Sequence, residues 1–253
     1  MIDYLDFSGK RAVVTGGRRG LGKAITVALA ERGASVAVIA RSQDGEDILQ
    51  EMERAGTSGC YLQCDLSRRE SRCGLIGRAM EHLSGPIDIL VNNAGFLFKE
   101  NLETCSFENW DASQSVLLEA PFDLCRQAAP IMKRQRSGKI INIASVNAVR
   151  ASQTEFSYGV MKGALMTMTR ILSNTLAPFN INVNAIAPGI CRSDLTVDHG
   201  IFDRERYWKV ADNYPLRRLG EAEDIAAIVL FLASEMSRNV SGHTLFADGG
   251  FCG

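Results

Sequence analysis

The stretch that decides the fold runs from residue 12 to residue 22 and reads Ala12-Val13-Val14-Thr15-Gly16-Gly17-Arg18-Arg19-Gly20-Leu21-Gly22. A short apolar run, a glycine-rich turn and a helix-forming stretch that continues to Glu31 follow one another. Glycines let the backbone turn tightly and approach a pyrophosphate, while free amides and the helix dipole favour its negative charge. This order predicts a phosphate cradle, although its T-G-x-x-x-G-x-G spacing differs from the commoner G-x-G-x-x-G.

Apolar runs continue to alternate with amphipathic segments along all 253 residues. We expect strands near residues 11–15, 35–40, 59–64, 87–91, 139–144, 181–187 and 243–247, with helices between them. Such alternation predicts right-handed crossovers and a parallel sheet covered by helices on both faces. No linker, repeat or low-complexity tract interrupts it, so we expect one α/β domain over residues 1–253, with a Rossmann-like doubly wound sheet of about seven strands.

A second group of residues could move a proton. Tyr158 and Lys162 stand four residues apart in a predicted helix and share a face, and Ser145 lies upstream at the end of a β-rich run. Lowering a phenol pKa from about 10 to about 7 takes roughly 4 kcal/mol, which one cation at ~4 Å supplies at an effective dielectric of about 20. We therefore expect Lys162 to lower the pKa of Tyr158. A Tyr-x-x-x-Lys pair alone is common in ordinary helices, and its meaning comes from the motifs around it.

Together with Asn92-Asn93-Ala94-Gly95, these residues resemble the short-chain dehydrogenase/reductase family. The resemblance runs almost end to end and includes Cys64-Asp65-Leu66, Pro188-Gly189 and the terminal Asp248-Gly249-Gly250. Within the family, the chain is similar to oxoacyl-carrier-protein reductases and to sugar-acid or polyol dehydrogenases. The resemblance implies the strand order 3-2-1-4-5-6-7, with ligand bound beyond the carboxyl ends of the strands.

The resemblance also implies a role for each matching residue. Tyr158 would exchange a proton with the substrate, Ser145 would hydrogen-bond the substrate oxygen, and Lys162 would hold the nicotinamide ribose. Asp65 would bind adenine. The residues expected to bind cofactor are Gly16, Arg18, Arg19, Gly20, Leu21, Gly22, Arg41, Asp65, Leu66, Asn92, Ala94, Gly95, Tyr158, Lys162, Pro188, Gly189, Ile190 and Ser193. A serine-hydrolase alternative fails because the chain has no G-x-S-x-G nucleophile elbow.

Cofactor choice depends on the residue that ends the second predicted strand, where Asp or Glu would bind the ribose 2′-hydroxyl and select NAD. Ala40 stands there, and Arg41 follows it. With Arg18 and Arg19 in the glycine turn, three guanidinium groups could surround a 2′-phosphate, and no carboxylate at the strand end would repel it. These arginines could also be solvated surface charges, but their coincidence with the expected phosphate position predicts NADP over NAD.

One position departs from the family pattern. Aligning Trp110-Asp111 with the family's W-D run puts Leu117 where an asparagine normally helps to anchor a water that links the lysine to solvent. A leucine side chain cannot hydrogen-bond, although its backbone carbonyl still can. We predict an NADP-dependent oxidoreductase that interconverts a carbonyl and a secondary alcohol by hydride transfer on a small polar substrate. The alternative is a nucleotide-binding sensor with little or no turnover.

Substrate and partner residues are less sharply marked. Asn147, Arg150 and Gln153 could contact the substrate and favour a hydroxylated or anionic one over a steroid, or they could be exposed loop residues. The looser pattern at residues 191–216 predicts a substrate lid. Residues 156–179 are apolar on more than one helix face, so we expect this helix to bury a partner helix as well as the sheet. The family resemblance implies a homotetramer.

Composition and charge exclude other classes. A formal net charge of −1 argues against a nucleic-acid binder. Residues 1–10 contain acidic side chains and no long apolar core, so we expect neither a signal peptide nor a membrane span, and a cytoplasmic location. Seven cysteines without C-x-x-C pairs and three scattered histidines predict reduced thiols and no metal site.

Overall fold

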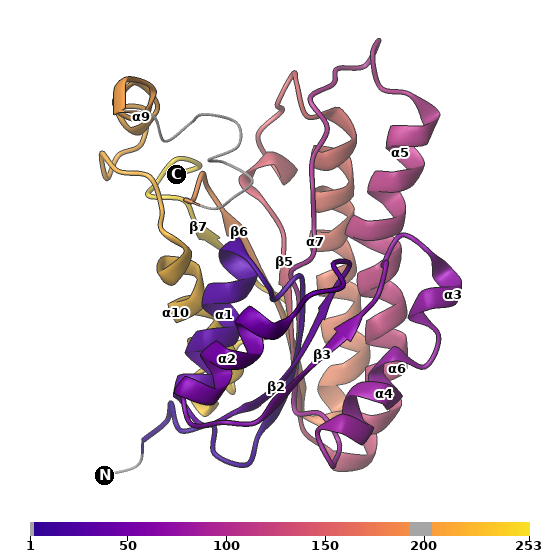
Figure 1. Cartoon of the computed structure of the whole chain (residues 1–253). Helices are drawn as coiled ribbons and strands as arrows, with labels where there is room; N and C mark the ends of the chain where they lie inside the picture. The colour runs from indigo at the N-terminus through magenta and orange to yellow at the C-terminus, as the bar shows by residue number, and fades with distance from the viewer. Residues whose placement is uncertain (1–2, 193–203) are drawn as a thin grey trace.

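The computed structural model describes residues 3–192 and 204–253. Their seven strands form one parallel sheet in the order β3-β2-β1-β4-β5-β6-β7, which confirms the predicted fold and strand order (Figure 1). The strands are β1 Arg11–Thr15, β2 Ser35–Ala40, β3 Gly59–Gln63, β4 Ile89–Asn92, β5 Gly138–Ile143, β6 Ile181–Pro188 and β7 Thr244–Ala247. Each predicted strand is present, and its ends lie within two residues of the expected ones.

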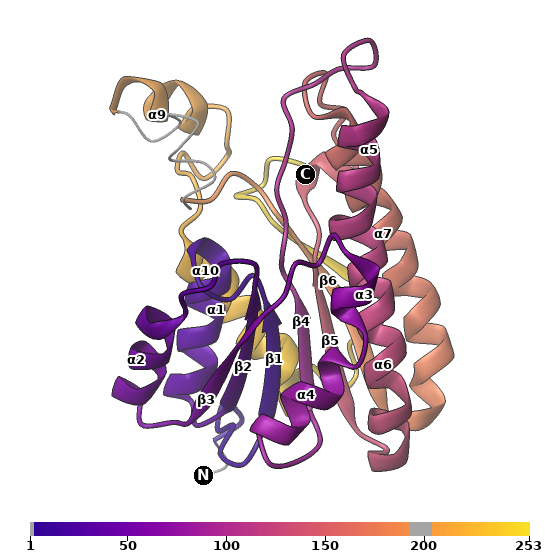
Figure 2. The same cartoon turned by 45° about the vertical axis from the view of Figure 1, so that its right-hand side comes forward.

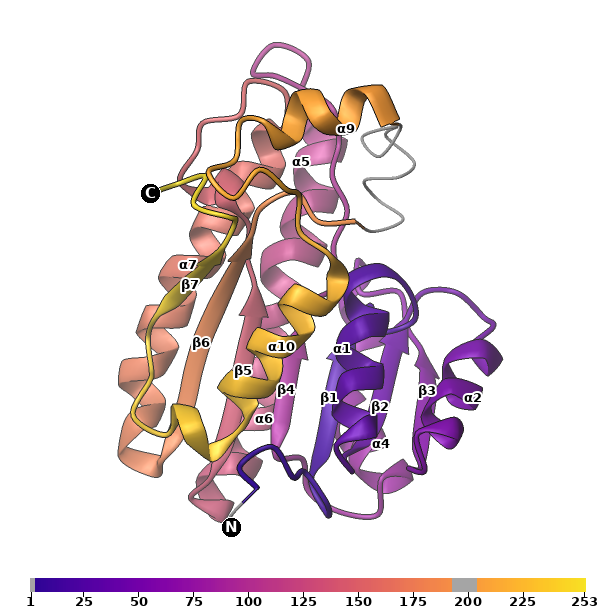
Figure 3. The same ribbon diagram turned by 90° about the vertical axis from the view of Figure 1, so that its left-hand side faces the viewer.

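Helices cover both faces of the sheet, and Figure 3 shows α1 and α10 in front of it. One layer consists of α1 Gly20–Glu31, α2 Glu46–Arg54 and α10 Ala222–Ala233. The other consists of the short α3 Arg69–Arg72, then α4 Leu75–His82, α5 Phe107–Gln114, α6 Ala120–Gln135 and α7 Phe156–Leu176. A single π-helical turn, η1 Ser115–Glu119, joins α5 to α6.

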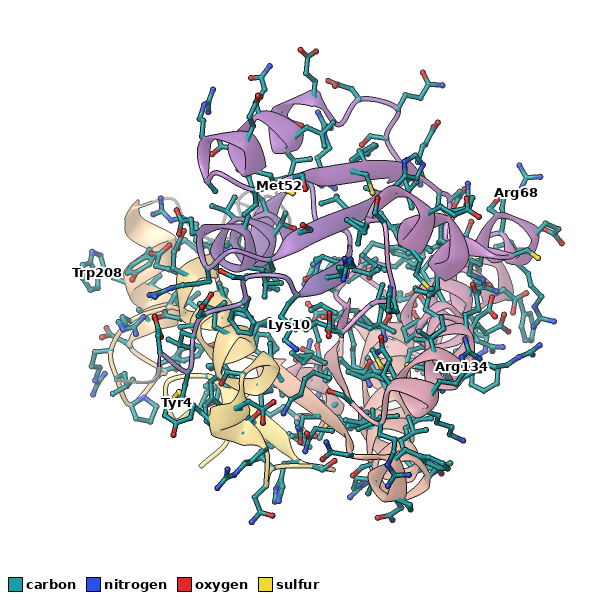
Figure 4. The ribbon with its side chains drawn as sticks, turned by 90° about the horizontal axis from the view of Figure 1, so that it is seen from below. Tyr4, Lys10, Met52, Arg68, Arg134 and Trp208 are labelled. Atoms are coloured by element: carbon teal, nitrogen blue, oxygen red, sulfur yellow. The ribbon has the colours of Figure 1, made fainter. Side chains whose placement is uncertain are left out.

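The two layers bury separate hydrophobic cores because successive strand residues point to opposite faces of the sheet. Val14 and Ile141 pack in the core under α1, α2 and α10. Val13 and Ile140, their neighbours along the chain, pack in the core under α4 and α6. Burial of each such side chain contributes about 1.5–3 kcal/mol, so a slip of one residue in any strand would disrupt both cores. Figure 4 views these layers from below, with Met52 of α2 above Lys10 and Arg134 of α6 to its right.

The carboxyl ends of the parallel strands all lie at one edge of the sheet, the upper edge in Figure 2. The glycine turn follows β1, the N-N-A-G run begins in β4, and Ser145 comes two residues after β5. Pro188 is the last residue of β6. The fold therefore collects the predicted motifs at this edge of the sheet, where the ligand crevice is expected.

Part of the predicted lid lies outside the described residues, namely 193–203, which include Ser193. The two ends of this segment lie side by side. The Arg192 amide donates to the Gly220 carbonyl at 2.8 Å, and the Gly220 amide donates to the Ile190 carbonyl at 2.9 Å. Between these points, α9 Arg204–Ala211 projects above the sheet on the side of the crevice (Figures 1 and 2).

Candidate active site

The glycine turn after β1 is a close-packed backbone cradle. Gly16 has φ +64°, and a Cβ on Gly22 would lie 2.0 Å from the Gly16 carbonyl oxygen. The turn is tied to the N-N-A-G run, because the Asn93 side-chain amide donates to Thr15 at 2.9 Å and the Thr15 hydroxyl oxygen accepts from the Ala94 amide at 3.0 Å. A bare, fixed backbone at the start of α1 suits a pyrophosphate.

The predicted adenosine end of the site is a cavity of about 350 Å³ lined by Arg18, Arg19, Arg41 and Ser42. Arg18 is held there by Asp47 at 3.2 Å and Asp44 at 3.4 Å. The end of β2 carries no carboxylate, as predicted from Ala40. Two carboxylates nevertheless reach this cavity, because Asp44 lies in the loop after β2 and Asp47 lies in α2. No ion pair within the described residues includes Arg19 or Arg41, so their guanidinium groups remain available to a 2′-phosphate.

Two other residues expected at the cofactor have contrasting environments. The Asp65 carboxylate accepts from the Ser67 hydroxyl at 2.7 Å, and this hydrogen bond holds the Asp65 pKa below its usual value. It is partly exposed and available to an adenine amino group. The Asn92 side chain is instead buried and donates to Asn142 of the neighbouring strand at 2.8 Å. Its side-chain NH₂ links β4 to β5, while its side-chain oxygen has no hydrogen-bond partner among the described residues.

The residues predicted to be catalytic come together beyond β5. Ser145 accepts the Asn147 backbone amide at 3.2 Å, which leaves its own hydroxyl proton to donate elsewhere. Lys162 is buried, and its Nζ donates to the Ile143 carbonyl at 2.5 Å and lies 5.6 Å from the centre of the Tyr158 ring. One turn of α7 thus places the phenol and the ammonium side by side, as expected.

The expected lowering of the Tyr158 pKa is not what the structure shows. Tyr158 keeps some accessible surface, but protein atoms crowd its hydroxyl, and burial raises its pKa to about 12. A side-chain hydrogen bond with Ser145 acts in the opposite direction, and the Glu155 charge adds to the rise. Burial also lowers the pKa of Lys162 to about 8. The prediction considered the cation and left out desolvation of both groups, which is the larger effect here.

Leu117 lies inside the π-turn η1 and is fully buried. A Cβ on Gly95 would lie 3.2 Å from Leu117 Cδ2 and 3.8 Å from Lys162 Nζ, so the leucine and the lysine flank the same glycine. The position that departs from the family pattern is therefore next to Lys162, the lysine predicted to be catalytic. The π-turn also carries backbone groups that regular α-helical bonding would occupy.

The substrate side of the crevice contains charged residues that the sequence analysis missed. Lys99 and Glu155 form an ion pair, and the other Glu155 oxygen accepts from the Asn147 side chain. The Arg150 guanidinium lies 3.7 Å from the centre of the Phe251 ring, and Gln153 is exposed. Glu155 lies three residues before Tyr158, so its proximity to the site could have been predicted from the sequence. Its ion pair with Lys99 could not, because the two residues are 56 positions apart.

Phe251 and Tyr214 link the chain terminus to the expected nicotinamide loop. Their rings stack with centroids 4.4 Å apart, and the Tyr214 hydroxyl accepts from the Ile190 amide at 3.1 Å. Arg150, Phe251, Tyr214 and Ile190 therefore form a continuous wall from the substrate side to the loop that follows Pro188. Within the described residues, no group of three or more His, Cys, Asp or Glu side chains could hold a metal ion.

Comparison with known proteins agrees with this site. Residues 16–252 match the family described as Enoyl-(Acyl carrier protein) reductase. The chain is 34% identical to 2-dehydro-3-deoxy-D-gluconate 5-dehydrogenase of Dickeya dadantii, over 99% of this chain and 98% of that protein. The crystal structure of a short-chain type dehydrogenase/reductase from Mycobacterium marinum superposes with a TM-score of 0.91 at 30% identity and 98% coverage of both chains.

A second solved structure adds ligands to the comparison. The gluconate 5-dehydrogenase of Burkholderia cenocepacia, in complex with NADP and tartrate, has a TM-score of 0.91 and 30% identity, and the match covers 99% of this chain and 98% of that one.

Proposed function

Since the chain belongs to the short-chain dehydrogenase/reductase family of NAD(P)-dependent oxidoreductases, we propose that it uses NADP to interconvert a carbonyl and a secondary alcohol on a small polar substrate. The observation that carries this proposal is the arginine-lined cavity at one end of the crevice that holds Ser145, Tyr158 and Lys162. The sensor alternative has no support, because the catalytic residues are complete and the relatives named above are dehydrogenases and reductases.

The bound dinucleotide would supply or accept the hydride, and the chain's own residues manage the proton. Ser145 would donate a hydrogen bond to the substrate oxygen without losing its proton, since its own oxygen already accepts the Asn147 amide. Tyr158 stays protonated at neutral pH because burial raises its pKa, so it can give a proton to the developing alkoxide. Lys162 carries a charge at neutral pH and would stabilise the phenolate left behind.

The glycine cradle and the arginine-lined cavity would bind different parts of the dinucleotide. We assign the pyrophosphate to residues 16–22, with Ala94 and Gly95 on its far side, and adenine to Asp65 and Leu66. Arg19 and Arg41, together with Arg18, would hold the 2′-phosphate through charge-assisted hydrogen bonds. Pro188, Gly189 and Ile190 would face the nicotinamide, and Ser193, outside the described residues, remains part of the proposal.

Arg41→Ala should weaken NADP binding much more than NAD binding, because the guanidinium is proposed to contact the 2′-phosphate, which NAD lacks. The expected loss is roughly ten- to a hundred-fold for NADP, the value of about one charge-assisted contact. Titration of both dinucleotides into the variant and into the control Arg134→Ala, an exposed arginine on α6, measures it. Equal losses for the two cofactors, or a wild type that prefers NAD, would contradict the assignment.

We propose a hydroxylated carboxylic acid as the substrate class. The Arg150 guanidinium lies against the Phe251 ring, which leaves its N–H edge to fork a carboxylate, and Asn147 and Gln153 could take hydroxyls. The related gluconate 5-dehydrogenase binds tartrate, a compound of this class. Assays with NADPH and NADP over panels of keto acids, sugar acids, neutral sugars and acyl thioesters test this, and activity confined to neutral sugars or thioesters would overturn it.

Leu117→Asn should change turnover by less than about tenfold, or about 1.4 kcal/mol of barrier. We expect this because a backbone carbonyl of the π-turn can hold the water that delivers the proton. Leu118→Asn makes the same change one residue further along the turn and controls for the effect of the amide on folding. A gain of more than tenfold in Leu117→Asn alone would mean that the wild type lacks an essential part of its relay.

Other parts of the proposal concern assembly and location. We propose a homotetramer, supported by the exposed apolar side chains of Phe107 on α5, Phe122 on α6, and Val160 and Ile171 on α7. Val160 and Ile171 lie three turns apart on one side of α7. We also propose that residues 191–216 close over the substrate, and that residues 1–253 act as one domain.

The proposed location is the cytoplasm. None of the seven cysteines, all of which are described, forms a disulfide, as suits a reducing compartment. No helix among the described residues combines the length and apolar character needed to cross a bilayer.

A further inference from the structure

Arg72, the last residue of α3, is one of the largest fully buried side chains of the molecule, with 1% of its surface exposed. Burying a charged group is unfavourable unless other groups satisfy it. Partners therefore have to surround this guanidinium, although its Nε makes no hydrogen bond with any described residue and is compensated by charge alone, and their identity shows what the residue holds together.

The partners come from three separate segments. Nη1 donates to the Leu66 carbonyl at 3.1 Å and to the Ser115 carbonyl at 2.9 Å. Nη2 lies 3.4 Å from a Glu119 carboxylate oxygen, and Nε lies 3.5 Å from one of Asp123. One side chain thus joins the adenine end of the crevice to both ends of the π-turn and to the start of α6.

The contact with Ser115 is the informative one. The Ser115 carbonyl also accepts the amide of Ala120, five residues later, which is the hydrogen bond that defines the π-turn. Arg72 donates to the same oxygen and so stabilises the arrangement in which the bond spans five residues. Leu117 lies within this turn and packs beside Gly95, where Lys162 Nζ is its neighbour.

We propose that Arg72 is a positioning residue: it holds the π-turn that carries Leu117 in place against the Lys162 site and couples that turn to the Leu66 end of the cofactor crevice. The part that concerns turnover rests on the proposed function. The guanidinium suits this place because Nη1 donates to both carbonyls while Nη2 and Nε face the two carboxylates. A lysine could reach only some of these acceptors.

Arg72→Met, which keeps length and removes the donors, tests the proposal directly. In the folded variant we expect the Ala120 amide to exchange with solvent at least tenfold faster, as measured by hydrogen exchange, and kcat to fall at least tenfold with KM changed little. The pH dependence of kcat should also shift, because the proton path beside Lys162 is altered. Arg72→Lys should have an Ala120 exchange rate and a kcat between those of Arg72→Met and the wild type.

Arg69→Ala is the matched control, since Arg69 contacts the same Glu119 carboxylate from the surface with 76% of its side chain exposed and reaches neither carbonyl. It should leave exchange and kcat unchanged. Arg72→Met with wild-type exchange at Ala120 and kcat within twofold would overturn the proposal, as would failure of both Arg72 variants to fold, which would assign the residue to folding alone. A wild type without turnover would contradict the proposed function, while the exchange measurement would still decide the role of Arg72.

Discussion

Tyr158→Phe should lose turnover by about 10²- to 10⁴-fold, the usual value of a general acid, while NADP affinity stays within a few-fold. The substitution keeps the ring that packs in α7 beside Lys162 and removes the only proton that the side chain can give. Initial rates with saturating cofactor and a dinucleotide titration measure the two effects separately. Tyr4→Phe makes the same change at an exposed position far from the crevice and should be silent. Turnover near the wild-type level in Tyr158→Phe would mean that another group delivers the proton.

Lys162→Met should also lose turnover by a comparable factor, and it should stabilise the fold in a pH-dependent way. Burial lowers the Lys162 pKa from 10.5 to about 8, so the folded state disfavours the charge. For such a group the destabilisation is fully present below pH 8 and is relieved as the pH rises toward 10.5, because the unfolded chain then also loses its proton. The difference corresponds to at most about 3 kcal/mol.

The advantage of Lys162→Met over the wild type should therefore be largest at pH 7 and should shrink toward pH 10. Urea unfolding at both pH values measures it. Tyr158 is present in both proteins, so its raised pKa does not affect the difference. Lys10→Met, at the opposite end of the sheet, controls for loss of one lysine. A Lys162→Met protein with the same stability difference at both pH values would show that the lysine is not held in a desolvated state.

Most of the fold could be predicted from sequence because it depends on local signals. Seven apolar runs with helical segments between them fix the strands, and the glycine turn at residues 16–22 fixes the first crossover. The strand order came from the family resemblance, since periodicity does not say which strands pair. The positions of Ser145, Tyr158 and Lys162 followed from two local facts, a strand end and one helical turn.

The parts that the sequence did not reveal all depend on residues distant in the chain. From the sequence, Arg18 is predicted to be an unpaired ligand of the 2′-phosphate, but in the structure it forms ion pairs with Asp44 and Asp47. Burial sets the pKa of Tyr158, and burial depends on the whole of the crevice. No local pattern marks Arg72 as buried, because three of its four partners, Ser115, Glu119 and Asp123, lie more than forty residues further along the chain.

The central claim, hydride transfer between NADP and a carbonyl, is tested most directly by following deuterium. The protein is incubated with each substrate of the keto-acid panel and with NADPH that carries deuterium at one or the other C4 position, and the product is analysed by mass spectrometry and NMR. We predict a secondary alcohol with one deuterium on the former carbonyl carbon, from one of the two labelled cofactors and not from the other, and at least about a hundredfold less of it in the same time with Tyr158→Phe. Tight binding of NADPH without any labelled alcohol, across the whole panel, would contradict the account.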